Sequence, residues 1–328
     1  ADPNASSDLV GEIRGAGATS QSDAQDAWMN TFMGANLRAT VDYAGGGSGA
    51  GRTKLVEGAV DFAGTDTPMT ADEIRRIGGA VELPLYISPI AVAYNLPGFT
   101  GESHVNMTGE VLAKVLSGAI TRWNDPALTA LNPGATLPDL RIIVVGRSDD
   151  SGTTKALTTY LATVAPKAWP HEPEETWPLR GGQSGDGTAG MIQTVSAATG
   201  TIGYADASKV PATLGTVAVG SNGAYVPVSA KAAAAALDAA TLGAEADETR
   251  LLYQPSHDAE GAYPIVLVSY LAARLRYDDA RIAAVVKAYL RFAASTWGQD
   301  ASTKATGCAP ITREMREKIN AAIDKIAA

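Results

Sequence analysis

The sequence predicts an α/β protein of two lobes, each a mostly parallel sheet flanked by helices. From Leu9 to about Ile87, strand-like and helix-like segments alternate, which is typical of a parallel sheet covered by helices. The chain has 328 residues, and this length exceeds one ordinary hydrophobic core. Its composition, with 45% hydrophobic and 19% charged residues, is that of a folded protein rather than a disordered one.

The first expected elements are a strand, a glycine turn and a helix. The strand covers residues 9–14 and runs into the turn Gly15-Ala16-Gly17-Ala18-Thr19-Ser20. Apolar residues then recur at helical spacing from Ala24 to Phe32. The first N–H groups of a helix have no partner inside the helix, so a turn of this kind can hold an anion.

A second strand, residues 39–43, enters the glycine-rich run Gly45 to Gly51, which contains Ser48. Missing side chains let backbone N–H groups approach a ligand closely. A flexible linker is the alternative interpretation, but a linker joins domains, and this run lies between a strand and a short helix. Neither glycine loop has the ending of a phosphate-binding NTPase loop or the dinucleotide-binding spacing. A small free anion therefore fits better than a nucleotide.

The third strand, beginning near Val60, places Asp66 just past its end. Asp66 could simply cap the helix that begins near Thr70. In an anion site, its carboxylate would repel a fully ionised ligand but accept a hydrogen bond from an oxyanion that still carries a proton. The second ionisation of a phosphate ester lies near pH 6, so species that carry a proton are common around neutrality, whereas sulfate has no proton to give. Asp66 would therefore select phosphate over sulfate.

The most informative stretch runs from Arg147 to Thr153, between a strand-like apolar run and a helix with apolar residues recurring from Ala156 to Val164. An anion at the start of this helix would meet free backbone N–H groups and the positive end of the helix dipole. The planar guanidinium group of Arg147 would add further donors at the same position. The alternative is that Ser151 only caps the helix and Arg147 pairs with Asp149.

Further elements follow from the same patterns. The apolar stretch Leu83 to Asn95 is interrupted by two prolines, and we expect it to be a strand that crosses to the second lobe. The proline- and tryptophan-containing segment 163–187 is expected to be a surface excursion within that lobe. The remaining expected elements are a helix at 108–116, a strand at 141–146, an alanine-rich helix at 229–240, a buried strand at 265–268, a helix at 278–294 and a terminal helix at 313–327.

Taken in order, these segments resemble the substrate-binding protein of the phosphate-specific ABC importer, the PstS family. The matching segments are Gly15 to Thr19, the loop containing Ser48, Val60 to Asp66 and Arg147 to Thr153, with Ala119 to Pro126 and Thr201 to Tyr204 as additional matches and a weaker one at Tyr263 to Ile265. The resemblance implies a two-lobe periplasmic-binding-protein fold of class II. Lobe I would comprise residues 1–87 and 261–328 and lobe II residues 88–260, with the ligand cleft between them and two chain crossings as a hinge.

The resemblance also implies a set of phosphate-binding residues. Donors would come from Thr19, Ser20 and Ser48 of lobe I and from Arg147, Ser151, Gly152 and Thr153 of lobe II, with Asp66 as the acceptor for the proton of the ligand. Asp149 would hold the guanidinium group of Arg147. Ser20 stands where the family often has an aromatic residue, and its backbone N–H is the expected donor. A contact near Gly185 to Gly187, where a helix begins, is a further expectation.

The implied function is high-affinity binding of inorganic phosphate outside the cytoplasm, by hinge closure, and delivery to the membrane permease subunits of an ABC importer. No cofactor or covalent step is implied. The implied location is the periplasm or the cell surface, with a lipid anchor in the native precursor. Alternatives remain: a binder of sulfate, molybdate or phosphonate, a phosphoesterase using Ser151 with Lys155 one helical turn away, or a surface antigen, adhesin or phosphate sensor.

Composition excludes several other classes. A net charge of −9 argues against nucleic acid and anionic lipid as partners, but it does not prevent local N–H groups from binding phosphate, since distant charges are screened beyond about 10 Å. Every apolar run is too short to span a bilayer. The polar segment Ala1 to Asp8 does not look like an export signal, so we expect that signal to have been removed. The three histidines lack metal-ligand spacing, and the single cysteine, Cys308, excludes an intrachain disulfide. We expect a monomer.

Overall fold

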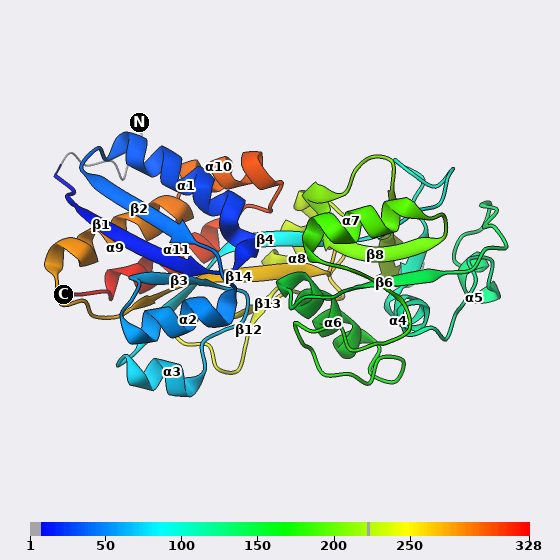
Figure 1. Ribbon diagram of the computed structural model, residues 1–328, viewed down its shortest axis with the longest axis horizontal. Coiled ribbons are helices and arrows are strands. Elements are labelled where there is room, and N and C mark those ends of the chain that lie inside the picture. The colour runs from blue at the N-terminus through cyan, green and yellow to red at the C-terminus, as the bar shows by residue number, and fades with distance from the viewer. Residues whose placement is uncertain (1–7, 222–223) are drawn as a thin grey trace. The chain divides into compact units, whose positions relative to one another are not determined.

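A computed structural model of the chain describes residues 8–221 and 224–328, so the segment considered above for an export signal lies almost entirely outside the described residues (Figure 1). The chain forms two compact units. The first comprises the residues up to Ile87 together with Ala240–Gln254 and Val268–Ala328, and the second comprises Ser88–Ala239 and Pro255–Leu267. Both units mix helices and strands, as the α/β prediction requires.

In the first unit, β1 (Gly11–Gly17) lies between β2 (Ala39–Ala44) and β3 (Phe62–Thr65), and it is parallel to both. Strand β14 (Val266–Arg274) pairs antiparallel with β3. The helices of this unit are α1 (Ser22–Ala35), α2 (Ser48–Glu57), α3 (Ala71–Arg76), α9 (Ala280–Ala294), α10 (Thr296–Thr306) and α11 (Arg313–Asp324), and a short 3-10 helix, η1, covers Thr19–Gln21. A small hairpin, β12 (Thr241–Leu242) and β13 (Tyr253–Gln254), completes it.

The helices of the first unit bury the apolar faces that the sequence predicted. In α1, Trp28 and Phe32 are fully buried, and the ring of Phe32 meets that of Tyr289 from α9 edge-on at 5.4 Å. Tyr289 in turn packs against Phe62 of β3 at 5.5 Å. Figure 1 shows α1 beside α10 and α9 beside α11, which are pairs of helices in direct contact. Aromatic residues therefore link the helix layer to the sheet.

In the second unit, β6 (Ile143–Arg147) lies between β7 (Gln183–Gly185) and β8 (Thr201–Asp206), and it is parallel to both. Strand β8 pairs antiparallel with the end of β4 (Ala80–Tyr94), and the same end of β4 pairs with β9 (Gly215–Thr216). A second sheet contains β5 (Asn106–Thr108), β10 (Ala218–Ser221) and β11 (Ala224–Val226). The helices are α4 (Gly109–Ser117), α5 (Pro126–Thr129), α6 (Gly152–Val164), α7 (Gly187–Ala197) and α8 (Ala230–Asp238), with a 3-10 helix, η2, at Ala207–Lys209.

The segment 163–187 is only partly the surface excursion that the sequence predicted. It runs without a helix or strand from the end of α6 to β7. However, Trp169 is 1% exposed and belongs to the core of the second unit, and the ring of Trp177 lies 5.3 Å from that of Tyr204. The two tryptophans anchor the segment because their large apolar surfaces are removed from water.

The boundaries of the two units differ from the predicted lobes at the C-terminal side. Residues 240–254, which the prediction placed in lobe II, belong to the first unit, and residues 261–267, which it placed in lobe I, belong to the second. The chain therefore passes between the units four times instead of twice. Backbone pairing explains the first difference, since the N–H of Glu82 donates to Thr249 and that of Leu251 donates to Glu82. For the second, the N–H of Ile90 donates to the carbonyl of Ile265.

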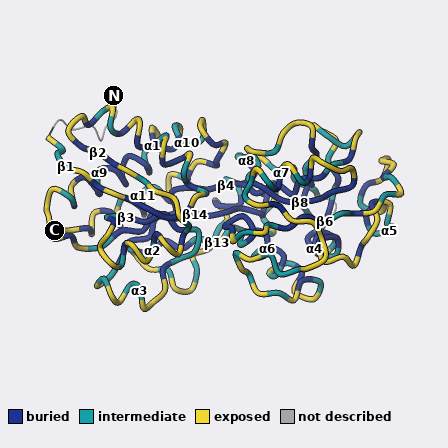
Figure 2. Tube along the Cα trace, viewed as in Figure 1, coloured by how far each residue is buried: buried dark blue, intermediate teal, exposed yellow. Residues whose placement is uncertain are grey.

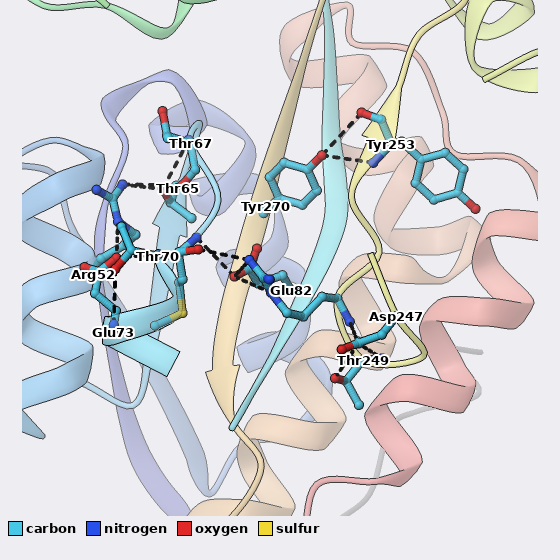
Figure 3. Close-up of polar contacts among 12 residues, drawn as sticks. Arg52, Thr65, Thr67, Thr70, Glu73, Glu82, Asp247, Thr249, Tyr253 and Tyr270 are labelled. Carbon is cyan, nitrogen blue, oxygen red and sulfur yellow. Dashed lines mark hydrogen bonds and ion pairs between the residues drawn. The ribbon is translucent and has the colours of Figure 1, made fainter. Parts of the chain in front are cut away.

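Strand β4 is buried along its whole length, and β14 is buried except at its last residue (Figure 2). Glu82 lies on β4 and is fully buried among polar side chains of the first unit (Figure 3). Its Oε1 atom accepts hydrogen bonds from the backbone N–H of Met69 at 3.1 Å and from the guanidinium group of Arg250 at 3.4 Å, whereas Oε2 is buried without a partner. Burial raises the pKa of Glu82 to about 7, against a smaller opposing effect of Arg250.

Glu82 should therefore make the stability of the protein depend on pH. Its pKa in the folded state lies above the ordinary value of 4.5, so between these two values the folded state binds more protons than the unfolded state. The contribution of this group is greatest below about pH 4.5 and falls as the pH rises towards 7. We expect the unfolding midpoint of Glu82→Gln to fall less than that of the wild type between pH 5 and pH 8. Exposed Glu57→Gln is the control, and equal pH dependence in Glu82→Gln and the wild type would contradict the assignment.

Candidate anion-binding site

The end of β1 brings Thr19 and Ser20 to the start of η1 in the first unit. Gly17 makes this possible: it has φ of 143°, and a Cβ atom on it would lie 2.0 Å from the carbonyl oxygen of Gly64. Only glycine fits such a close approach of β1 to β3. Thr19 is exposed and Ser20 is half-buried, and the hydroxyl group of Ser20 reaches Asp66 in the turn that follows β3.

Ser48 is the first residue of α2, directly after Gly47, which has φ of 98°. The helix start packs against the end of β1, because a Cβ atom on Gly51 would lie 2.5 Å from the carbonyl oxygen of Ala16. The hydroxyl group of Ser48 accepts a hydrogen bond from the backbone N–H of Asp66 at 2.9 Å. A hydroxyl group that accepts one bond still has a proton to give, so Ser48 can also donate to an ion.

Asp66 follows β3 immediately, as the sequence predicted. Two hydroxyl groups donate to its Oδ1 atom, that of Ser20 at 2.7 Å and that of Ser269 at 2.5 Å. The alternative role as a helix cap does not apply, because α3 is capped by Thr70, whose side chain accepts from Glu73 N–H and whose own N–H donates to the Glu73 carboxylate. Asp66 is therefore available for a role other than capping.

In the second unit, β6 ends at Arg147 and α6 begins at Gly152, with Ser151 as its N-cap. The hydroxyl group of Ser151 accepts from the N–H of Thr153 at 3.1 Å and lies 2.5 Å from the hydroxyl group of Thr153. The capping role considered from the sequence is thus present. It coexists with the anion-site geometry, because capping leaves other N–H groups of the first turn without partners inside the helix.

Arg147 and Asp149 form a two-pronged ion pair, with Nε to Oδ1 at 2.7 Å and Nη2 to Oδ2 at 2.6 Å. The hydrogen bonds from Arg147 hold the pKa of Asp149 at about 2, and the N–H of Gly187 adds to this effect. The pair is therefore charged throughout the neutral range. The remaining Nη1 atom of Arg147 donates to the hydroxyl group of Thr153 at 3.4 Å, so this edge of the guanidinium group faces the start of α6.

The residues predicted for each lobe thus come together within each unit. Thr19, Ser20, Ser48 and Asp66 lie at neighbouring strand ends of the first unit, and Arg147, Asp149, Ser151, Gly152 and Thr153 lie at the start of α6 in the second. Gly187, expected near the site, donates its backbone N–H to Oδ1 of Asp149 at 3.0 Å.

The sequence analysis gave no role to Ser269 or to Tyr204, although Tyr204 ends the matching segment Thr201 to Tyr204. Ser269 follows the matched segment Tyr263 to Ile265 by four residues, and this proximity is the one signal that could have drawn attention to it. The hydroxyl group of Tyr204 accepts from the backbone N–H of Arg147 at 3.0 Å and lies 2.7 Å from the hydroxyl group of Thr154. Tyr204 therefore fixes the end of β6 relative to α6.

Two other features bear on the class of site. In the described part of the chain, no group of three or more His, Cys, Asp and Glu side chains lies in a position to hold a metal ion. Among residues 8–221 and 224–328, no helix is long and apolar enough to cross a membrane.

Comparisons with known proteins agree with this fold. A family model described as a PBP superfamily domain matches residues 2–296. Phosphate-binding protein PstS 3 of Mycobacterium tuberculosis is 33% identical, and the match covers 96% of this chain and 86% of that protein. Phosphate-binding protein PstS 2 of the same organism is 31% identical, covering 96% of this chain and 87% of the relative. A solved phosphate-binding protein from Stenotrophomonas maltophilia superposes with a TM-score of 0.69 at 20% identity, over 95% of this chain and 94% of that one.

The structural likeness, at this low identity, supports the two-lobe periplasmic-binding-protein fold. The family model and the PstS relatives cover nearly the whole chain, including the glycine turns and the segment from Arg147 to Thr153. The chain therefore belongs to the PBP superfamily and, within it, to the PstS family of phosphate-binding proteins.

Proposed function

We propose that the protein binds inorganic phosphate outside the cytoplasm and delivers it to the membrane permease of an ABC importer. The observation that carries this proposal is the pairing of hydroxyl and N–H donors with one carboxylate, Asp66, at the strand ends of the first unit. A site for a fully ionised anion gains nothing from a carboxylate, whereas a site for a protonated oxyanion gains an acceptor. The names of the PstS relatives are consistent with this ligand.

The proposed mechanism is binding by closure. One phosphate ion accepts from Thr19, Ser48 and the N–H of Ser20 of the first unit, and from the donors of the second unit, namely Arg147, Ser151, Gly152 and Thr153. An ion that bonds to both units stabilises the closed arrangement over the open one. Asp66 accepts a hydrogen bond from a protonated oxygen of the ion, so either the monohydrogen or the dihydrogen form can bind. No covalent step is needed.

Selectivity against sulfate follows from hydrogen bonding. At neutral pH every common form of phosphate carries at least one proton, whereas sulfate carries none. A sulfate ion would leave the carboxylate of Asp66 facing an oxygen lone pair, and a site with an unmatched buried polar group rejects the wrong ligand by roughly four to five decades. The same reasoning disfavours molybdate as the physiological ligand.

The phosphoesterase alternative is weaker. The hydroxyl group of Ser151 is bonded to the N–H and the hydroxyl group of Thr153, which suits a helix cap rather than an activated nucleophile. Incubation with a chromogenic phosphate ester should give no turnover. Roles as an antigen, adhesin or sensor would use the same site, and only phosphate uptake by cells that lack the protein separates transport from these roles.

Location and partners follow from the family. PstS proteins act outside the cytoplasm, and we place this protein in the periplasm or at the cell surface, with a lipid anchor in the native precursor. The permease subunits are its proposed partners, and it is proposed to meet them as a monomer.

The ligand can be tested directly. Protein purified without added phosphate should retain a tetrahedral anion, and phosphate assay after denaturation should identify it. After exhaustive dialysis, calorimetric titration should show one phosphate per chain. Absence of phosphate binding by the dialysed, folded protein would overturn the proposed function.

A further inference from the structure

A chain of buried polar side chains lies behind Asp66 in the first unit. It runs from Tyr289 of α9 through Gln25 of α1 and Gln21 of η1 to Ser269 of β14. All four of these side chains are fully buried. The successive distances are 2.6 Å from Tyr289 to Gln25, 3.0 Å from Gln25 to Gln21 and 2.6 Å from Gln21 to Ser269, and Ser269 then reaches Asp66 at 2.5 Å.

The direction of these hydrogen bonds is fixed by a backbone carbonyl group. The side-chain amide of Gln21 lies 3.0 Å from the carbonyl oxygen of Tyr270, which can only accept, so the amide nitrogen of Gln21 must be on that side. The same nitrogen donates to the hydroxyl group of Ser269. The hydroxyl group of Ser269 therefore accepts one hydrogen bond from Gln21 and donates its own proton to Asp66.

The far end of the chain supports the same direction. The oxygen of the Gln21 amide accepts from Gln25, and the oxygen of the Gln25 amide accepts from the hydroxyl group of Tyr289. Burial raises the pKa of Tyr289 well above its ordinary value, so the phenol keeps its proton and remains a donor. In every hydrogen bond of this chain, the donor is the residue further from Asp66 and the acceptor is the residue nearer to it. Satisfied buried networks of this kind hold their members in one arrangement.

We propose that Ser269 and the hydroxyl group of Ser20 are positioning residues that fix Asp66 as a hydrogen-bond acceptor and thereby set the preference for phosphate over sulfate. This inference rests on the proposed function. Both hydroxyl groups donate to Oδ1, from β14 on one side and from η1 on the other. Two donors on one carboxylate oxygen stabilise its negative charge and orient its plane. Neither residue needs to touch the ligand through its side chain.

Removal of one donor should therefore act on discrimination more than on binding in general. In Ser269→Ala, the carboxylate of Asp66 loses one of the two donors that fix its orientation, so it meets the protonated oxygen of phosphate in a less favourable geometry and can turn away from sulfate. We expect the ratio of phosphate affinity to sulfate affinity to fall by about tenfold, which is the effect of losing one hydrogen bond to a charged group. Ser269→Thr keeps the hydroxyl group on a strand residue and should restore the ratio.

The test is calorimetric titration of the dialysed full chain with phosphate and with sulfate. The variants are Ser269→Ala, Ser269→Thr and Ser20→Ala. The control is Ser302→Ala, since Ser302 is a fully buried serine of the same unit whose hydroxyl group donates to the carbonyl of Gln299 instead of Asp66. Ser20 is half-buried, so Ser20→Ala keeps the proposal testable if Ser269→Ala does not fold.

A double-mutant cycle with Asp66→Asn separates positioning from packing. If the hydroxyl groups set the ratio through the carboxylate of Asp66, Ser269→Ala and Ser20→Ala should lower the ratio in the wild-type background. They should change it much less when Asp66 is asparagine, because an amide group can pair with either anion and any loss of its orientation affects both. An unchanged ratio in the foldable single variants, or an equal effect in both backgrounds, would overturn the inference. A wild-type protein that fails to bind phosphate would instead overturn the proposed function, so the wild type is titrated with phosphate before any variant.

Discussion

Asp66→Asn is expected to bind sulfate at least about a hundredfold more tightly than the wild type does, with a smaller loss of phosphate affinity. The amide group of asparagine can both donate and accept, so it can offer an N–H to an oxygen of sulfate where the carboxylate offers only a lone pair. The two hydroxyl groups that donate to Oδ1 of Asp66 can still bond to the amide oxygen, so the local structure should persist. Competitive calorimetry with the two anions measures the change.

The control for this variant is Asp42→Asn, which removes an exposed carboxylate of β2 in the same unit. This substitution changes the net charge by the same amount, but Asp42 has no predicted contact with the ion. If sulfate remains excluded by Asp66→Asn, or if both variants gain sulfate binding equally, selectivity does not depend on this carboxylate.

Arg147→Ala is expected to weaken phosphate binding by about 1–3 kcal/mol, which is the range for a lost charge-assisted hydrogen bond and corresponds to a factor of roughly 5 to 150. The side chain of Arg147 is 9% exposed and that of Asp149 is 34% exposed, so the variant leaves Asp149 with partial access to water. Arg147→Lys should be intermediate, because an ammonium group keeps the charge but cannot pair with Asp149 through two parallel bonds. Phosphate titration at fixed salt measures both effects.

A matched control exists in the same unit. Arg122 pairs with Asp139 at 2.6 Å on the surface, where both side chains are at least half exposed. Arg122→Ala removes an arginine and breaks an Arg–Asp pair without touching the start of α6, so phosphate affinity should stay within error of the wild type. Equal losses in Arg122→Ala and Arg147→Ala would indicate a general effect of charge, and no loss in Arg147→Ala would move the site elsewhere.

Local features of the site were predictable from the sequence because they depend on short segments. The turn ending at Ser20, the loop containing Ser48 and the run from Arg147 to Thr153 each follow a strand and begin a helix, as the alternating pattern indicated. The pairing of Arg147 with Asp149 also follows from their separation of two positions. Conformational preferences of glycine and of capping residues act within a few residues, and they are readable without a structure.

Non-local contacts were not predictable in the same way. Ser269 and Asp66 lie 203 positions apart, and no local preference of either residue indicates their hydrogen bond. The ion pair of Glu82 and Arg250 is equally non-local, since the two residues lie 168 positions apart. Arg250 belongs to residues 240–254, which the sequence prediction placed in the wrong unit. From the sequence alone, a serine in a buried strand is predicted to be a small core residue, because only the fold shows which carboxylate it contacts.

The central claim is that Asp66 accepts a hydrogen bond from a proton of the bound ion. A crystal structure of the phosphate complex at about 1 Å resolution tests it most directly. We predict a phosphate oxygen at about 2.5–2.7 Å from a carboxylate oxygen of Asp66, the distance of a hydrogen bond from a hydroxyl group to an ionised carboxylate. A bound phosphate with Asp66 turned away from it, or an ion held at another place altogether, would contradict the account.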